Sequence, residues 1–148
     1  MNEQSFTTTL TFDQTPQHVF DAVINTKEWW SGEITGNTHQ LNNEFTYQYK
    51  EAHFSRQRIV ELIPNQKVVW LVTESKLSFT EDPSEWTGTK ISFEITELDS
   101  KTQLRFSHIG LNSEIECFEG CSTAWSQLIH QSLASLITTG KSNPVFFG

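Results

Sequence analysis

The sequence has 148 residues, the length of one ordinary domain, and a chain of this size buries about 70% of its unfolded surface on folding. Ten Lys and Arg against eighteen Asp and Glu give a formal net charge of −8, which argues against binding to nucleic acid or to an anionic membrane surface. No segment approaches the apolar length of a membrane span, and no basic start precedes an apolar run. We therefore expect neither membrane insertion nor export, and a cytoplasmic location.

The first predicted elements are a strand and a short helix. Apolar residues alternate with serine and threonine from Ser5 to Phe12, the pattern of a half-buried strand. Thr15 can cap a helix that begins at Pro16 and carries an inner face of Val19, Phe20, Val23 and Ile24. Asn25 and Thr26 end this helix or cap a second short one, Lys27 to Trp30.

A run of strand-like segments follows these helices. The segments with alternating apolar and polar residues are Glu44–Lys50, Ile59–Ile63, Lys67–Thr73, Lys90–Thr96 and Gln103–His108. Short turns at Pro64-Asn65 and Asp99-Ser100 connect neighbouring segments, which indicates an antiparallel meander. Residues 81–88 contain Pro83 and Gly88 and are expected to form a loop.

The segment before Pro64 has two faces that the pattern does not distinguish. Arg56 and Arg58 share one face with Phe54, Val60 and Leu62, whereas Ser55, Gln57 and Ile59 lie on the other. If the arginines face inward, a guanidinium group could hold a carboxylate in the interior. If they face outward, they are ordinary solvated charges, and burying an unpaired cation costs several kcal/mol.

A long amphipathic helix is predicted from Cys117 to about Thr139. Its inner stripe recurs at steps of three and four residues and contains Phe118, Cys121, Trp125, Leu128, Ser132 and Leu136. A helix of this length after several strands needs a sheet to cover. The order of elements therefore predicts an α+β fold in which a curved antiparallel sheet wraps around the C-terminal helix, in a single domain over residues 1–140 with a tail over residues 141–148.

Metal, cofactor and nucleophile motifs do not occur in the sequence. Cys117 and Cys121 are four residues apart, which suits neither a typical disulfide framework nor a CxxC redox pair, so we interpret them as two small buried side chains. The five histidines have no HxxxH spacing that would complete a zinc site. GxSxG, GxGxxG and HExxH are also absent. We therefore expect no metal and no cofactor, and we assign no catalytic residue.

Four features together resemble a known superfamily. They are Thr15-Pro16 with Val19-Phe20, the Trp29-Trp30 pair, the stretch from Val60 through Pro64 to Trp70, and Trp125 with Leu128, Leu133 and Leu136. This order is similar to the START-like (SRPBCC, helix-grip) superfamily, and most similar to the family of the activator of heat-shock-protein-90 ATPase homologues. The resemblance implies a helix-grip fold with two short helices and a hydrophobic cavity, which in the superfamily holds lipids, sterols, polyketides or aromatic molecules.

The cavity implied by this fold is expected to have mainly aromatic walls. The expected ligand-binding residues are Trp29, Trp30, Tyr47, Tyr49, Trp70, Phe93, Phe106, His108, Trp125 and Leu128. His108 is the one titratable group on the face of Leu104 and Phe106, where it could act as a general base, bind a ligand, or simply bond to a neighbour. The hydroxyl groups of Tyr47 and Tyr49 could orient a ligand or reach water.

Three functions remain open at this point. The first is non-catalytic binding of a small hydrophobic or aromatic molecule. The second is a co-chaperone-like interaction module, with a protein partner such as a chaperone. The third is a cyclase or hydratase of the polyketide type that uses His108 or a tyrosine. An interior filled with side chains would favour the interaction module, whereas two converging titratable groups in an open cavity would favour the enzyme.

Overall fold

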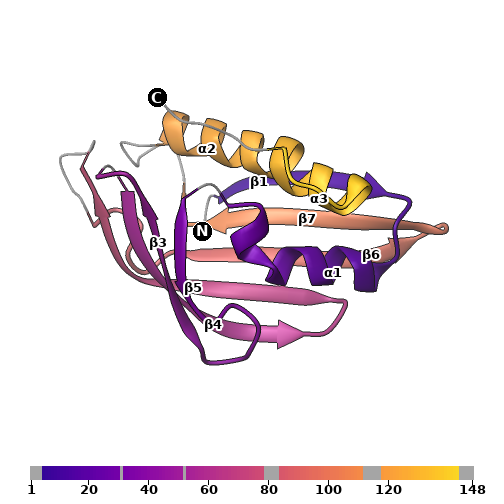
Figure 1. Cartoon of the computed structure of the whole chain (residues 1–148), viewed down its shortest axis with the longest axis horizontal. Coiled ribbons are helices and arrows are strands. Elements are labelled where there is room, and N and C mark those ends of the chain that lie inside the picture. Colours follow the sequence, from indigo (N-terminus) through magenta and orange to yellow (C-terminus); the bar gives the residue numbers. More distant parts are fainter. Residues whose placement is uncertain (1–4, 31, 52, 79–83, 112–117, 144–148) are drawn as a thin grey trace.

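The structure is a computed structural model that describes residues 5–30, 32–51, 53–78, 84–111 and 118–143. Seven strands form one antiparallel sheet in the order β1-β7-β6-β5-β4-β3-β2, and the helices lie across one of its faces (Figure 1). The strands are β1 (Ser5–Phe12), β2 (Glu33–Gly36), β3 (Glu44–Tyr49), β4 (His53–Ile63), β5 (Lys67–Leu77), β6 (Lys90–Leu98) and β7 (Lys101–Ile109). The fold is therefore the α+β helix grip that the order of elements predicts.

The segment after β1 begins as its sequence predicts and then departs from it. The helix α1 (Pro16–Ile24) is capped by Thr15, whose Oγ1 accepts a 3.1 Å hydrogen bond from the backbone N–H of His18. The second helix is a 3₁₀ turn, η1 (Thr26–Glu28), so the expected range of Lys27 to Trp30 is wrong. The backbone N–H groups of Trp29 and Trp30 both bond to the carbonyl of Thr26, and the turn ends at Trp29, whose φ of −125° is not helical. Both tryptophans are buried.

The short edge strand β2 has no counterpart among the predicted segments. It spans four residues and pairs with β3, from Glu33 opposite Gln48 to Gly36 opposite Phe45. Gly36 has a φ of +109°, and a Cβ there would lie 2.7 Å from the carbonyl oxygen of Glu44. Glycine thus allows the two backbones to approach at the point where β2 ends.

The orientation of β4 is settled by burial. Ser55, Gln57 and Ile59 are fully buried against the helices, whereas Arg58 is exposed. Arg56 lies on the outer face, where its Nη1 donates to Oε1 of Glu74 at 2.9 Å. The arginines therefore do not face the interior, and the carboxylate-clamp alternative is wrong. The pairing with β5 shifts register twice along β4, which breaks the simple alternation.

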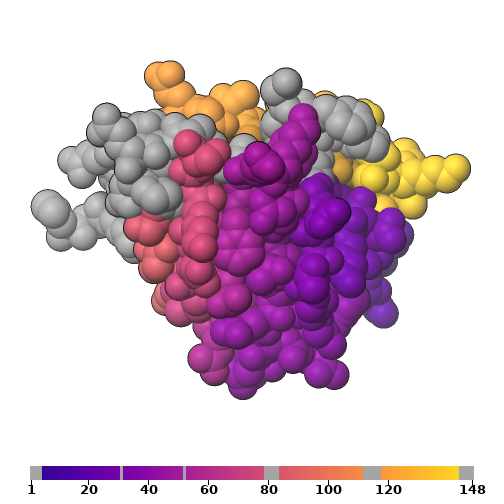
Figure 2. Space-filling model, turned by 60° about the vertical axis from the view of Figure 1, so that its left-hand side comes forward, coloured from indigo at the N-terminus to yellow at the C-terminus, as the bar shows by residue number. Residues whose placement is uncertain are grey.

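The C-terminal helix covers the concave face of the sheet over 22 described residues. It runs without interruption through α2 (Phe118–Gln127), the π-helical segment η2 (Leu128–Leu133) and α3 (Ala134–Thr139), and ends at Gly140 with a φ of +84°. Its buried side chains include Cys121, Trp125, Leu128, Ile129, Ser132, Leu133 and Ile137, which confirms the predicted inner face. Figure 2 shows this helix, orange to yellow, along the top of the molecule, above the purple β2–β4 region.

The cysteines differ from expectation. Cys121 is buried, as expected, but it is disulfide-bonded, so the expectation that the cysteine spacing suits no disulfide is wrong. Cys117, the other cysteine and the predicted start of the helix, lies outside the described residues, as do residues 144–148 of the predicted tail. None of the helices in the described part of the chain combines the length and the apolar character that a membrane crossing requires.

Candidate functional site

The expected lining residues come together between the sheet and the helices. Eight of them are at most 3% exposed: Trp29, Trp30, Tyr47, Trp70, Phe93, Phe106, Trp125 and Leu128. Tyr49 is partly buried and packs against the same cluster, and His108 is completely buried beside Trp125. The pattern of alternation and helical periodicity thus places these ten side chains in one shared interior.

Near-parallel aromatic rings fill the middle of this interior. Trp29, Trp30 and Trp70 lie within 13° of parallel, with ring centroids 5.8 to 6.4 Å apart. Tyr47 stacks on Trp30 at 4.0 Å, and Trp125 approaches Trp30 from the C-terminal helix at 5.2 Å. Burial and the neighbouring Tyr49 raise the pKa of Tyr47 far above its ordinary value, so its hydroxyl group stays protonated.

Trp86 belongs to this interior although the sequence pattern does not place it there. It comes from the connection between β5 and β6, is 3% exposed, and stacks on Trp125 at 5.9 Å. The rings of His53 and His108 both meet it edge to face, at 4.5 and 4.7 Å. A large aromatic residue in an otherwise polar loop is the signal that indicates burial at this position, because an indole excludes a large apolar area from water.

His108 is held in a chain of hydrogen bonds. The indole N–H of Trp125 donates to its Nδ1 at 3.0 Å, so the ring proton resides on Nε2, which donates to Thr89 Oγ1 at 2.8 Å. Thr89 in turn donates to the carbonyl oxygen of Trp86 at 2.6 Å. Burial, and secondarily the nearby His53, lower the pKa of His108 to about 3. The ring is therefore neutral at physiological pH, and neither nitrogen is available for proton transfer.

A second set of hydrogen-bonded polar side chains lies on β4 and β5. Ser55 Oγ accepts a 2.5 Å hydrogen bond from Nε2 of Gln57 and lies 3.3 Å from Nε2 of His53. Ser75, opposite Ser55 in the sheet, is 3.1 Å from the hydroxyl of Thr87. Burial also lowers the pKa of His53 to about 3. We call His53, Ser55, Gln57, Ser75, Thr89 and His108 the polar band, and none of its members carries a charge at neutral pH.

Three buried polar atoms in this interior have no hydrogen-bond partner in the described structure. They are Oε1 of Gln57, Nε1 of Trp70 and Nε1 of Trp86. More than nine in ten buried polar groups in native proteins are paired with protein or with ordered water. Three unpaired polar atoms in one aromatic interior are therefore unusual. These atoms offer one acceptor and two donors to a molecule that reaches them.

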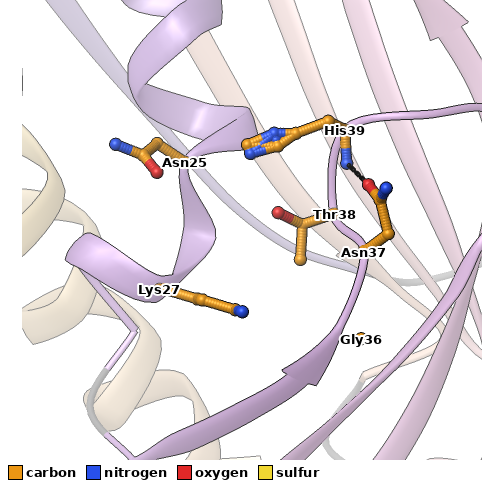
Figure 3. Close-up of a pocket in the computed structure, with 6 residues that line it drawn as sticks. All are labelled: Asn25, Lys27, Gly36, Asn37, Thr38 and His39. Carbon is orange, nitrogen blue, oxygen red and sulfur yellow. Dashed lines mark hydrogen bonds between the residues drawn. The ribbon is translucent and has the colours of Figure 1, made fainter.

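Two surface hollows lined by described residues lie away from this interior, whereas a third, of about 420 Å³, reaches Tyr49. One of about 300 Å³ lies between the end of α1 and the segment that follows β2, and Asn25, Lys27, Gly36, Asn37, Thr38 and His39 line it (Figure 3). Thr38 Oγ1 donates to the carbonyl of Ile24 at 2.8 Å, which fixes its floor. A larger hollow, of about 630 Å³, lies on the outer face of the sheet around Phe54, Arg56 and Glu74. Within the described residues, no group of His, Cys, Asp and Glu side chains could hold a metal ion.

Comparisons with known proteins agree with this architecture. The model of the family described as "Activator of Hsp90 ATPase homolog 1-like protein" matches residues 13–138. A search of curated proteins found no match.

Solved structures share the fold at low sequence identity. The Aha1 dimer from Colwellia psychrerythraea is 22% identical with a TM-score of 0.75, over 94% of this chain and 99% of that one. CalU16 from Micromonospora echinospora is 13% identical with a TM-score of 0.66, over 93% and 78%. DynU16, from the dynemicin biosynthetic locus, is 11% identical with a TM-score of 0.69, over 95% of this chain and 49% of that one.

Proposed function

Because the chain belongs to the activator of Hsp90 ATPase homolog 1-like family, we propose that it is a small-molecule binding domain of that family, whose sheet and C-terminal helix enclose a hydrophobic or aromatic guest. The observation that carries this proposal is the set of unpartnered polar atoms on Gln57, Trp70 and Trp86 within an aromatic interior. Ligand sites combine apolar walls with a few convergent polar groups in this way. The walls supply affinity, and the polar atoms select and orient the guest.

A route into the interior is provided by Trp86. Its ring is held by a turn between β5 and β6, in which the N–H of Thr89 bonds to the carbonyl of Trp86 and that of Thr87 to Ser84. We propose that Trp86 moves aside when the guest enters and then packs against it, while the sheet stays intact.

A protein-interaction role is the second candidate. The stacked rings of Trp29, Trp30, Trp70 and Tyr47 fill much of the interior, which favours a module that binds a partner through its surface. The description of the matching family, an activator of the Hsp90 ATPase, supports a chaperone as that partner. We do not propose a cyclase or hydratase, since both ring nitrogens of His108 are engaged within the protein.

Native mass spectrometry and fluorescence test the proposal together. Freshly purified protein is expected to carry a small molecule, or to show a saturable change in tryptophan fluorescence when titrated with a panel of lipids and aromatic amides. All five tryptophans lie in the ring cluster, so a guest within it alters the emission. A protein that copurifies with nothing and responds to no member of the panel would leave the interaction module as the better function.

A further inference from the structure

One end of the buried Gln57 amide has no hydrogen-bond partner in the interior. Gln57 is completely buried, and its Nε2 donates to Ser55, whereas its Oε1 has no partner. Ser55 engages only one of the two polar atoms of this amide, and with Nε2 on Ser55 the unpaired atom is the acceptor Oε1. Leaving such a group unpaired in the interior is unfavourable, and a guest that bonds to it would recover that loss.

Trp86 presents the complementary group in the same region. Its ring meets that of His53 at 4.5 Å, His53 lies 3.3 Å from Ser55, and Ser55 bonds to Gln57. Three consecutive contacts thus connect the ring of Trp86 to the amide group of Gln57. A guest bridging them must accept one hydrogen bond and donate another.

Among the described residues, no charged side chain faces the interior where it could pair with an ionised guest. Arg56 is committed to Glu74 on the outer face, and Arg58 is exposed on that same face. The titratable groups that do face the interior are His53, His108 and Tyr47, and burial keeps all three uncharged near neutral pH. A carboxylate or phosphate would therefore lose its hydration without gaining a counter-ion, which is strongly unfavourable.

We infer, on the basis of the proposed binding function, that the guest is an uncharged aromatic molecule that presents a hydrogen-bond donor beside an acceptor, as a primary amide or lactam does. Its acceptor takes the N–H of Trp86, and its donor bonds to Oε1 of Gln57. Ionised acids of the same shape are disfavoured because neither Arg56 nor Arg58 faces the interior and no other cation does so in the described part of the chain.

Three probes of matched shape test this inference by calorimetry at pH 7.5. They are 1-naphthaleneacetamide, its methyl ester analogue and 1-naphthaleneacetate. The polar end of the amide donates and accepts hydrogen bonds, that of the ester only accepts them, and that of the acetate is an ionised acceptor. The amide should bind at least about tenfold more tightly than the carboxylate, with the ester in between because it leaves Gln57 unsatisfied. Equal or tighter binding of the carboxylate overturns the inference but leaves the proposed function intact. Binding by none of the three overturns the proposed function and the inference with it.

Substitutions test which side chains cause the preference for the amide probe. In Gln57→Met the preference for the amide over the ester should disappear, and in Trp86→Phe, which keeps the ring but removes the N–H, both neutral probes should weaken by about five- to tenfold. Arg58→Met, on the same strand but on the outer face, is the matched control and should bind all three as the parent does. Thermal melts identify any variant that fails to fold. If Gln57→Met does not fold, the binding of the neutral probes to Trp86→Phe decides the assignment. An amide preference that survives in both interior variants overturns the assignment.

Discussion

The hydroxyl group of Ser132 donates a 2.6 Å hydrogen bond to the backbone carbonyl oxygen of Trp29, deep in the interior. Both residues are about 1% exposed. The bond joins the π-helical part of the C-terminal helix to the segment that follows η1, 103 positions earlier in the chain. It therefore fixes the point from which the Trp29-Trp30 pair enters the core.

Replacing Ser132 with alanine should lower the free energy of unfolding by about 1–2 kcal/mol, because the carbonyl of Trp29 would be left buried without a partner. Urea unfolding measures the loss. Ser135→Ala on the same helix is the control, since its hydroxyl bonds to the carbonyl of Lys141 at the surface, and it should cost under about 0.5 kcal/mol. Equal losses in the two variants would contradict a buried role for Ser132.

Replacing Trp125 separates packing from hydrogen bonding. Trp125→Ala should destabilise the protein by about 3–5 kcal/mol, because its neighbours cannot close a void of that size. Trp125→Phe keeps most of the ring but leaves Nδ1 of His108 without its donor, and should cost about 1–3 kcal/mol. An unchanged urea midpoint in the alanine variant would mean that this residue faces solvent.

His108, which is fully buried, and His53, which is half-buried, should make stability fall in mild acid. Their pKa values are about 3 in the folded protein and near 6.5 in the unfolded chain. Below pH 6.5 the unfolded chain therefore binds protons that the folded protein does not, so the stabilisation present above that pH is lost as the pH falls toward 3. At pH 5 the loss should be about 2 kcal/mol for each ring.

Urea unfolding at pH 7.5, 6 and 5 measures how the free energy of unfolding changes with pH. His53→Gln should flatten this dependence, while His39→Gln, at the exposed hollow of Figure 3, should leave it unchanged. A parent protein with constant stability from pH 7.5 to 5 would show that both histidines are solvated.

The outward position of Arg56 has its own test. A double-mutant cycle with Arg56→Met and Glu74→Gln should give a coupling energy of about 0.2–1 kcal/mol, as for other half-exposed ion pairs. Neither substitution should change the binding of a neutral aromatic probe. A coupling of several kcal/mol would place the pair in a dry environment and return the guanidinium to the interior.

Sequence periodicity predicts much of this fold for physical reasons. The inward faces of β6 and β7, with Phe93, Phe106 and His108, follow from strict alternation over regular pairing. The cap at Thr15 follows from side-chain chemistry alone. Both signals are local, so a single sequence is sufficient to find them.

The remaining features depend on contacts that a single sequence does not encode locally. β2 has four residues, too few for a period to be recognised. Both faces of β4 mix apolar and polar residues, and its register shifts twice, so parity could not orient Gln57. Trp86 is buried by partners from β4, β7 and the C-terminal helix, which are distant in sequence. For this reason the polar half of the candidate site emerges only from the structure.

The wide π-helical turn at η2 compensates for the four-residue spacing of the buried side chains on the C-terminal helix. Cys121, Trp125, Ile129, Leu133 and Ile137 recur strictly every four residues, and each such step overshoots a full α-helical turn by about 40°. Over the whole stripe the drift would carry Ile137 nearly to the opposite side, yet it is 1% exposed. The π-helical segment advances fewer degrees per residue and rotates the second half back toward the sheet. Deleting a single residue from 128–133 would shorten one of these four-residue steps to three and remove most of the drift, so an ordinary α-helix would then keep α3 on the sheet. We therefore expect a one-residue deletion between homologues to be tolerated best in this segment.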